Sequence, residues 1–129
     1  DISGMKVLVV EDNALNLEIA RSLLEDGGAK VTSAGNGKEA VEVFSASSAG
    51  YFDAILMDIM MPVMDGIAAA RAIRALPRPD AAEVPIIAMT ANAFAEDEES
   101  THAAGMNEHL TKPIDSVRLH RVLAKYKVK

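Results

Sequence analysis

The sequence predicts an α/β fold: an open, doubly wound (βα)5 parallel sheet with strand order 2-1-3-4-5. Two observations lead to this prediction. Short apolar runs alternate with amphipathic segments five times along the 129 residues, which is the pattern of strand–helix–strand units joined by right-handed crossovers. The connections are only a few residues long. A closed eight-stranded barrel would need roughly twice this length, so the sheet is expected to be open.

The first half of the chain begins this alternation. The β-branched run at residues 5–10 is typical of a strand buried on both faces. A helix is expected from Asn13, a good N-cap residue, to the glycines at 27–28, with Leu17, Ala20 and Leu24 facing inward. The shorter, more polar run at 30–34 predicts a strand near a sheet edge. The turn at 36–37 then leads into a helix that faces inward with Ala40, Val41 and Phe44.

The second half continues the alternation. Strands are expected at 52–57, 85–90 and 106–111, and a helix capped by Asp65 is expected to run through Leu76. The acidic segment at 94–104 has few large apolar residues, which predicts a loosely held helix. The last helix has the clearest inward stripe, which consists of Leu119, Val122, Leu123 and Tyr126.

Composition limits the classes of function. The chain is long enough for one domain, which we expect at 5–129 after a flexible lead-in at 1–4. The formal net charge is -6, which argues against broad attraction to nucleic acid. The absence of cysteine excludes disulfides and thiolate metal sites, and it fits a reducing, cytoplasmic setting. The sequence contains no apolar run of the roughly 20 residues that a membrane span needs.

Polar side chains stand where the predicted strands end. Glu11 and Asp12 follow the first strand, Asp58 the third, Thr90 the fourth and Lys112 the fifth. In a doubly wound sheet the ligand site lies at the carboxyl ends of the strands, near the topological switch. In the order 2-1-3-4-5, strands 1, 3, 4 and 5 are neighbours, so these five side chains are expected to meet in one cleft.

Electrostatics indicate what this cleft would bind. Two like charges at ~4 Å repel by roughly 4 kcal/mol at an effective dielectric of 20, and a divalent cation relieves such repulsion at neutral pH. An all-oxygen ligand set favours Mg²⁺ over zinc. Such an ion beside Thr90 and Lys112 would make a site for a phosphoryl group, with Asp58 as the attacking oxygen.

These residues carry a family resemblance. From Met5 to about Lys127 the chain resembles a response-regulator receiver domain, and it looks most like the receivers fused to hybrid histidine kinases. The motifs that match are the acidic pair in Val-Val-Glu11-Asp12-Asn13, the block from Met57-Asp58 through Pro62 to Asp65-Gly66, Thr90-Ala91, and Lys112-Pro113.

The resemblance implies a role for each acid. Asp58 would accept a phosphoryl group from a phosphohistidine on a partner protein. Asp12, Asp58 and the main-chain carbonyl of Met60 would bind Mg²⁺, or Mn²⁺, directly. Glu11 would act on the same ion through a water molecule.

The resemblance also assigns the groups around the phosphoryl site. Thr90 and Lys112 would hold the phosphoryl oxygens, and Thr90 would form a switch with His109, which stands where the family usually has Tyr or Phe. The bond between Lys112 and Pro113 is expected to be cis. From their positions, two residues beyond Asp58 and Thr90, Met60 and Asn92 are expected to flank the path of an attacking water molecule.

The function expected from the resemblance is that of a phosphorelay receiver, a module that phosphorylates and dephosphorylates itself rather than a turnover enzyme. Its partner would be the dimerisation and phosphotransfer domain of a histidine kinase or a histidine-containing phosphotransfer protein, with no contact to nucleic acid or membrane. Three alternatives stay open: a degenerate receiver that only docks proteins, a flavodoxin-like binding domain, and an aspartyl-phosphate phosphatase. The phosphatase would need a second acid where Met60 stands.

Overall fold

A computed structural model describes residues 2–91, 99 and 101–127 of the chain. Its centre is a five-stranded sheet in the order β2-β1-β3-β4-β5, and every neighbouring pair is parallel. The predicted fold class and strand order are therefore confirmed. The strands are β1 (Lys6–Val10), β2 (Lys30–Ala34), β3 (Ala54–Asp58), β4 (Ile86–Thr90) and β5 (Glu108–Thr111).

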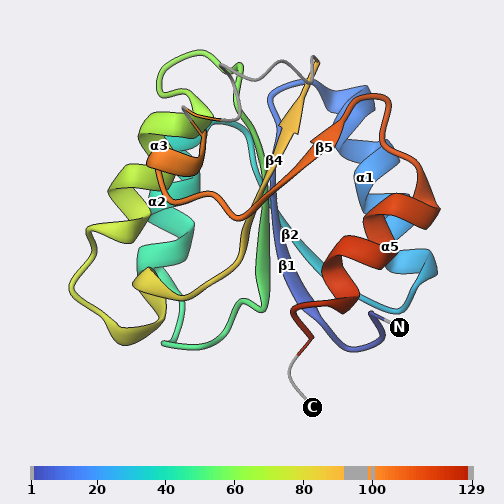
Figure 1. Ribbon diagram of the computed structural model, residues 1–129, viewed down its shortest axis with the longest axis horizontal. Helices are drawn as coiled ribbons and strands as arrows, with labels where there is room; N and C mark the ends of the chain where they lie inside the picture. The colour runs from blue at the N-terminus through green and yellow to red at the C-terminus, as the bar shows by residue number, and fades with distance from the viewer. Residues whose placement is uncertain (1, 92–98, 100, 128–129) are drawn as a thin grey trace.

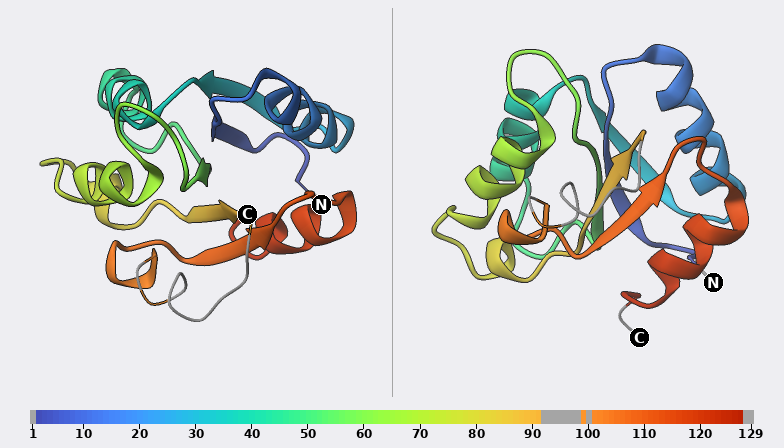
Figure 2. Two further views of the ribbon diagram at one scale, coloured as in Figure 1. Left: turned by 90° about the horizontal axis from the view of Figure 1, so that it is seen from above. Right: turned by 45° about the horizontal axis from the view of Figure 1, so that its top comes forward.

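Helices cover both faces of the sheet, as Figures 1 and 2 show. One face carries α1 (Ala14–Asp26) and α5 (Ser116–Ala124), and the other carries α2 (Gly37–Ala46) and α3 (Gly66–Arg74). A short 3-10 helix, η1 (Pro79–Ala82), precedes β4 and was not expected from the sequence. Of the predicted helix at 94–104, residues 99 and 101–103 are helical, and positions 94–98 and 100 lie outside the described residues.

Side-chain caps fix where the helices begin. Asn13 caps α1, Asn36 caps α2, Asp65 caps α3 and Asp115 caps α5, each by accepting a backbone N–H three residues further along. Each cap satisfies one of the free donors of a first helical turn. The caps Asn13 and Asp65 were predicted from the sequence, because a cap and its donor lie within one turn of each other, whereas the Asp115 cap was not predicted.

Strands β1 and β4 begin one residue later than predicted, and β3 and β5 begin two residues later. Just before β3 and β5 a side chain contacts the neighbouring strand. Before β3, the Asp53 carboxylate accepts the N–H of Lys6 at 2.8 Å. Before β5, the Asn107 amide oxygen accepts the N–H of Ile86 at 2.9 Å. Strand β2 lies at an edge and is the more exposed one, as its polar sequence predicted, whereas all five residues of β3 are buried.

The apolar core is divided by the sheet into two clusters. The larger one packs under α2 and α3 around Phe44 and Ile73, and the other packs under α1 and α5 around Leu24 and Leu119. Ile2 joins the second cluster and is only 1% exposed. This burial was not expected for a residue in the predicted flexible lead-in at 1–4.

A histidine also ties the helices on this second face together. The Nε2 atom of His120 on α5 lies 2.9 Å from the main-chain oxygen of Leu23 on α1. Among the described residues, no helix is long and apolar enough to cross a membrane.

Candidate functional site

Three carboxylates meet at the carboxyl edge of the sheet. Glu11 and Asp12 follow β1 directly, and Asp58 is the last residue of the adjacent strand β3. One ligand oxygen from each acid lies within 4.8 Å of the others. Glu11 and Asp58 are each only 3% exposed, whereas Asp12 is open to solvent. The cluster therefore has a buried floor and one accessible side.

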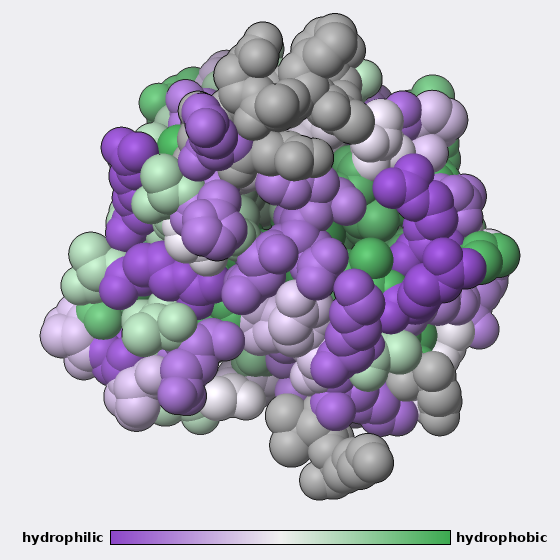
Figure 3. Space-filling model, in the orientation of Figure 1, coloured by the Kyte–Doolittle hydropathy of each residue, from purple (hydrophilic) through white to green (hydrophobic). Residues whose placement is uncertain are grey.

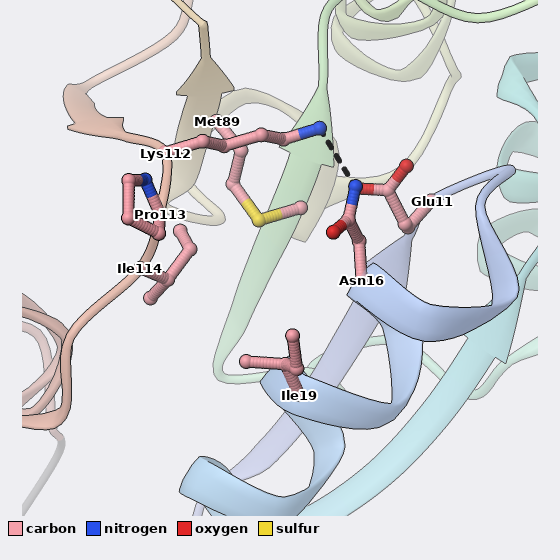
Figure 4. A pocket seen from close by; sticks show the side chains of 7 residues that line it. All are labelled: Glu11, Asn16, Ile19, Met89, Lys112, Pro113 and Ile114. Carbon is pink, nitrogen blue, oxygen red and sulfur yellow. Dashed lines mark ion pairs between the residues drawn. The ribbon is translucent and has the colours of Figure 1, made fainter.

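Lys112 brings a positive charge into this cluster from the loop after β5. Its Nζ atom lies 2.9 Å from Oε1 of Glu11 and 3.1 Å from Oδ2 of Asp58. Figure 4 shows the side chain reaching across from the β5 side towards Glu11 at the end of β1. The peptide bond between Lys112 and Pro113 is cis. The amine thus bridges two acids that are 47 residues apart in the sequence.

Backbone donors position the two buried acids. The N–H of Met60 donates to Oδ1 of Asp58 at 3.1 Å, and the N–H of Asn13 donates to Oε2 of Glu11 at 3.2 Å. Burial raises the pKa of Glu11 above its ordinary value, and the neighbouring Asp58 carboxyl raises it further. Burial by itself would lower the pKa of Lys112, but its hydrogen bonds to the same two acids raise it overall.

The sheet register brings Thr90 to the same edge. Asp58 pairs with Met89 of β4, so Thr90 lies one step further along and pairs with Thr111, next to Lys112. Thr90 is buried at 1% exposure. All five residues predicted to meet at this edge therefore lie at the carboxyl ends of neighbouring strands.

His109 lies two residues before the end of β5, half-buried. Its Nε2 atom contacts the hydroxyl of Thr101, a buried residue in the segment before β5. The imidazole thus has a polar partner in the position where the resemblance suggested a moving aromatic ring. Asn92, proposed to flank the path of water, lies outside the described residues.

A groove flanks the acidic cluster on the α1 side. Figure 3 shows apolar surface right of centre, framed by hydrophilic residues, on the side where Figure 1 places α1 and α5. Figure 4 shows the side chains that line the groove: Glu11, Asn16, Ile19, Met89, Lys112, Pro113 and Ile114. The buried acids therefore open beside a largely apolar wall.

The chemistry of this donor set fits a hard divalent cation. Three carboxylates and one ammonium leave a local charge of -2 when all are ionised. The ligands are oxygens only, which suits Mg²⁺ with retained water molecules. Asp12, the exposed member, leaves the cluster accessible from solvent.

Comparison with known protein families places this geometry in context. The model of the response regulator receiver domain matches residues 7–124. The signal transduction histidine-protein kinase BarA of Escherichia coli is 44% identical over 124 residues, which cover 96% of this chain but 13% of the kinase. The chain thus spans about an eighth of the length of that relative.

Two solved structures are similar to this chain in fold and sequence. The receiver domain of sensor histidine kinase PA1611 from Pseudomonas aeruginosa, crystallised with magnesium in its active-site cleft, is 40% identical with a TM-score of 0.85, and the match covers 96% of this chain and 98% of that one. A second structure is the complex of the histidine phosphotransfer protein Ypd1 with the receiver domain of Ssk1 from Saccharomyces cerevisiae. It matches with 30% identity and a TM-score of 0.83, and the match covers 96% of this chain and 89% of that one.

Proposed function

This chain belongs to the response regulator receiver domain family of two-component and phosphorelay systems, and from that premise we propose that Asp58 accepts a phosphoryl group from a phosphohistidine of a partner protein. In the proposed step an Asp58 oxygen attacks phosphorus, the P–O bond forms, the P–N bond to the imidazole breaks, and the imidazole leaves with its electron pair. The observation that carries the proposal is the meeting of Glu11, Asp12, Asp58 and Lys112 at one sheet edge.

We assign the metal ligands in the same proposal. Asp12, Asp58 and the main-chain carbonyl of Met60 would hold Mg²⁺ directly, and Glu11 would do so through water. Support comes from the spacing of the three carboxylates and from the magnesium in the cleft of the PA1611 receiver. When bound, the ion would supply positive charge against the anionic phosphoryl oxygens.

The chain's own residues would supply the remaining contacts to the phosphoryl group. The amine of Lys112 would neutralise charge on the transferred group, and its distance of 3.1 Å from Oδ2 of Asp58 supports this role. Thr90, on the strand next to Asp58, would bind a second oxygen. A shift of Thr90 towards the phosphoryl group would then be coupled to His109, two residues before the end of β5.

We further propose that the phosphoryl donor is a histidine kinase or a histidine phosphotransfer protein that docks beside α1, and that transfer takes place in the cytoplasm. Leu15 on α1 is 70% exposed and Ile19 is 42% exposed. Leu17 packs against the core instead, so the apolar surface offered by α1 centres on Leu15. The Ypd1–Ssk1 complex supports this class of partner.

The test is labelling of the protein by acetyl phosphate with Mg²⁺, followed by intact-mass measurement. The wild-type chain should gain the mass of one phosphoryl group, and Asp58→Asn should gain none. Asp26→Asn is the matched control because Asp26 is exposed at the far end of α1. Labelling that persists in Asp58→Asn would refute the assignment, and a wild type that is never labelled would favour a receiver that only docks proteins.

A further inference from the structure

The loop between β3 and α3 contains a backbone conformation found at no other non-glycine residue in the described part of the chain. Val63 has a φ of 68°, and the N–H of Met64 donates to the carbonyl of Pro62 at 2.7 Å. This i to i+2 hydrogen bond closes a γ-turn with Val63 at its centre, and the form with positive φ is rare and strained. A β-branched side chain makes the left-handed region still less favourable.

Contacts at both ends of the loop hold this turn in place. The N–H of Gly66 donates to the carbonyl of Ile59 at 3.1 Å, and the N–H of Gly37 donates to the carbonyl of Met64 at 3.0 Å. A Cβ atom at Gly37 would overlap that Met64 oxygen, so the approach of α2 to the loop is as close as a glycine permits. Strain of this kind persists only where the surroundings over-determine the backbone.

The strained turn directs an apolar side chain into solvent. Val63 is 78% exposed and Met60 is 76% exposed, whereas Met61 and Met64 of the same loop pack against the core. Val63 therefore adds almost no burial to the isolated domain, although an Asn or Gly at this position would fit the turn more easily. What the valine contributes must be sought outside the chain.

The position of the loop indicates what would cover Val63. Met60 donates its N–H to Asp58, so the loop borders the phosphoacceptor directly. Figures 1 and 2 place it above α3, on the side of the sheet away from α1. The acidic cluster does not by itself attract the negatively charged phosphoryl group of a donor, so apolar contacts beside the site would contribute to the donor's close approach.

We infer that Val63 is a specificity-determining contact for the protein that delivers the phosphoryl group, and that an apolar patch beside the donor's phosphohistidine covers it. This inference rests on the proposed function. Leu15 lies in the first turn of α1, just after Asp12, and Val63 lies in the loop that follows Asp58. A donor that brings its histidine to Asp58 would bury both side chains.

The experiment compares two rates of Asp58 phosphorylation in each variant: the rate from a phosphorylated protein and the rate from acetyl phosphate. The protein probes are phosphorylated Ypd1 and the autophosphorylated kinase core of BarA. Val63→Asn, which suits a left-handed backbone, should raise the thermal unfolding midpoint and lower the ratio of the two rates by about tenfold. The matched control Val63→Ile keeps the apolar branched side chain and should keep the ratio within about twofold of wild type.

A stabilised Val63→Asn variant whose ratio of the two phosphorylation rates equals that of the wild type would overturn the inference. This holds even if the variant changes the self-association of the domain, because Val63 would then serve another contact. An equal fall in Val63→Ile would overturn it as well, because the apolar contact is then not what matters. A wild-type domain labelled by acetyl phosphate but by neither protein donor would also count against it. If acetyl phosphate does not label Asp58 at all, the proposed function itself fails.

Discussion

The charged side chains at the two ends of the parallel sheet are held in different ways. At the amino end, Arg74 of α3 donates to the main-chain oxygens of Gly105 and Ala81 and to the side chain of Asn107. At the same end, Arg78 binds the Asp80 carboxylate at 2.7 Å and carbonyls at the end of α2. These cations contact the carbonyl-rich ends of helices and loops, where a positive charge is favoured.

The carboxyl end has the reverse arrangement. Three acids gather there, and the ammonium of Lys112 pairs with two of them, Glu11 and Asp58. The acids lie before helix starts rather than after helix ends. Both arginines at the amino end have their donors matched by acceptors, whereas the acids at the carboxyl end retain an excess negative charge. The charged groups at the amino end therefore stabilise the fold, whereas the excess negative charge at the carboxyl end favours the binding of a further positively charged ligand.

The largest expected effect follows from removing the amine at the carboxyl end. Lys112→Met keeps the aliphatic stem but leaves Glu11 and Asp58 without their cation, so charge on the transferred group is no longer neutralised. Labelling of Asp58 by acetyl phosphate should slow on the order of 10²–10³-fold, the usual loss for one such donor. Time-resolved intact-mass measurement checks this.

Lys125→Met is the matched control for this change. Lys125 forms a longer, exposed ion pair with Glu108, 3.5 Å apart, at the other end of the sheet, and exposed pairs contribute little. Its labelling rate should stay at the wild-type value. A Lys112→Met protein that is labelled as fast as Lys125→Met would remove the functional distinction between the two ends.

The next effect concerns stability at the amino end. Arg74→Met should lower the free energy of unfolding by about 2–3 kcal/mol, because the partly buried carbonyls of Gly105 and Ala81 lose a charged donor. Urea unfolding measures the change. Arg71→Met, an exposed position on the same helix, should change stability by less than about 0.5 kcal/mol. Equal losses in the two variants would show that the Arg74 contacts are not special.

A smaller effect, which increases stability, is expected from removing one of the three acids at the carboxyl end. Asp12→Asn leaves both ion pairs of Lys112 intact but relieves repulsion, so without Mg²⁺ it should raise the free energy of unfolding by roughly 0.5 kcal/mol. The wild type should gain stability when Mg²⁺ is added, by about 2.7 kcal/mol at a hundredfold excess over Kd, and the variant should gain far less. Matching Mg²⁺ responses would contradict the role of Asp12 as a ligand.

The smallest effect appears only at alkaline pH. Burial and the hydrogen bond from its hydroxyl to Glu108 raise the pKa of Tyr126 from 10.0 to about 12. The pKa of Tyr126 is higher in the folded than in the unfolded chain. The protonated Tyr126 therefore stabilises the fold below pH 10.0, and this stabilisation is lost as the pH rises towards about 12. Tyrosinate absorbance should show a step at about pH 12 that disappears in Tyr126→Phe. If the step remains, it belongs to the chain's other tyrosine.

The candidate site was more predictable than the amino end of the sheet. Its acids, hydroxyl and amine stand directly at strand ends, so the alternation of elements was enough to bring Glu11, Asp58 and Lys112 to one edge. The arginines gave no such signal. Arg74 reaches Asn107 across 33 residues, and a long flexible side chain at a helix end has too many possible partners for sequence patterns to choose among them.

Val63 and Ile2 illustrate a second limit. The block around Pro62 indicated a turn, but its type follows from the closure of the loop by Gly37 and Gly66, one of which lies in another helix. Ile2 is buried in the cluster under α1 and α5, where its side chain packs closely against Gly27. Neither outcome can be read from the residue's own neighbours in the sequence.

By itself the sequence determined the fold class, the strand order, the caps Asn13 and Asp65, and the edge at which polar residues gather. All of these depend on interactions within a few residues or on a regular period, and such interactions are encoded locally. Only the tertiary structure decided which acids share the amine of Lys112, which carbonyls hold Arg74, and which apolar side chain of the β3–α3 loop faces solvent. These choices depend on distances between segments that are brought together by packing, and packing is a property of the whole chain.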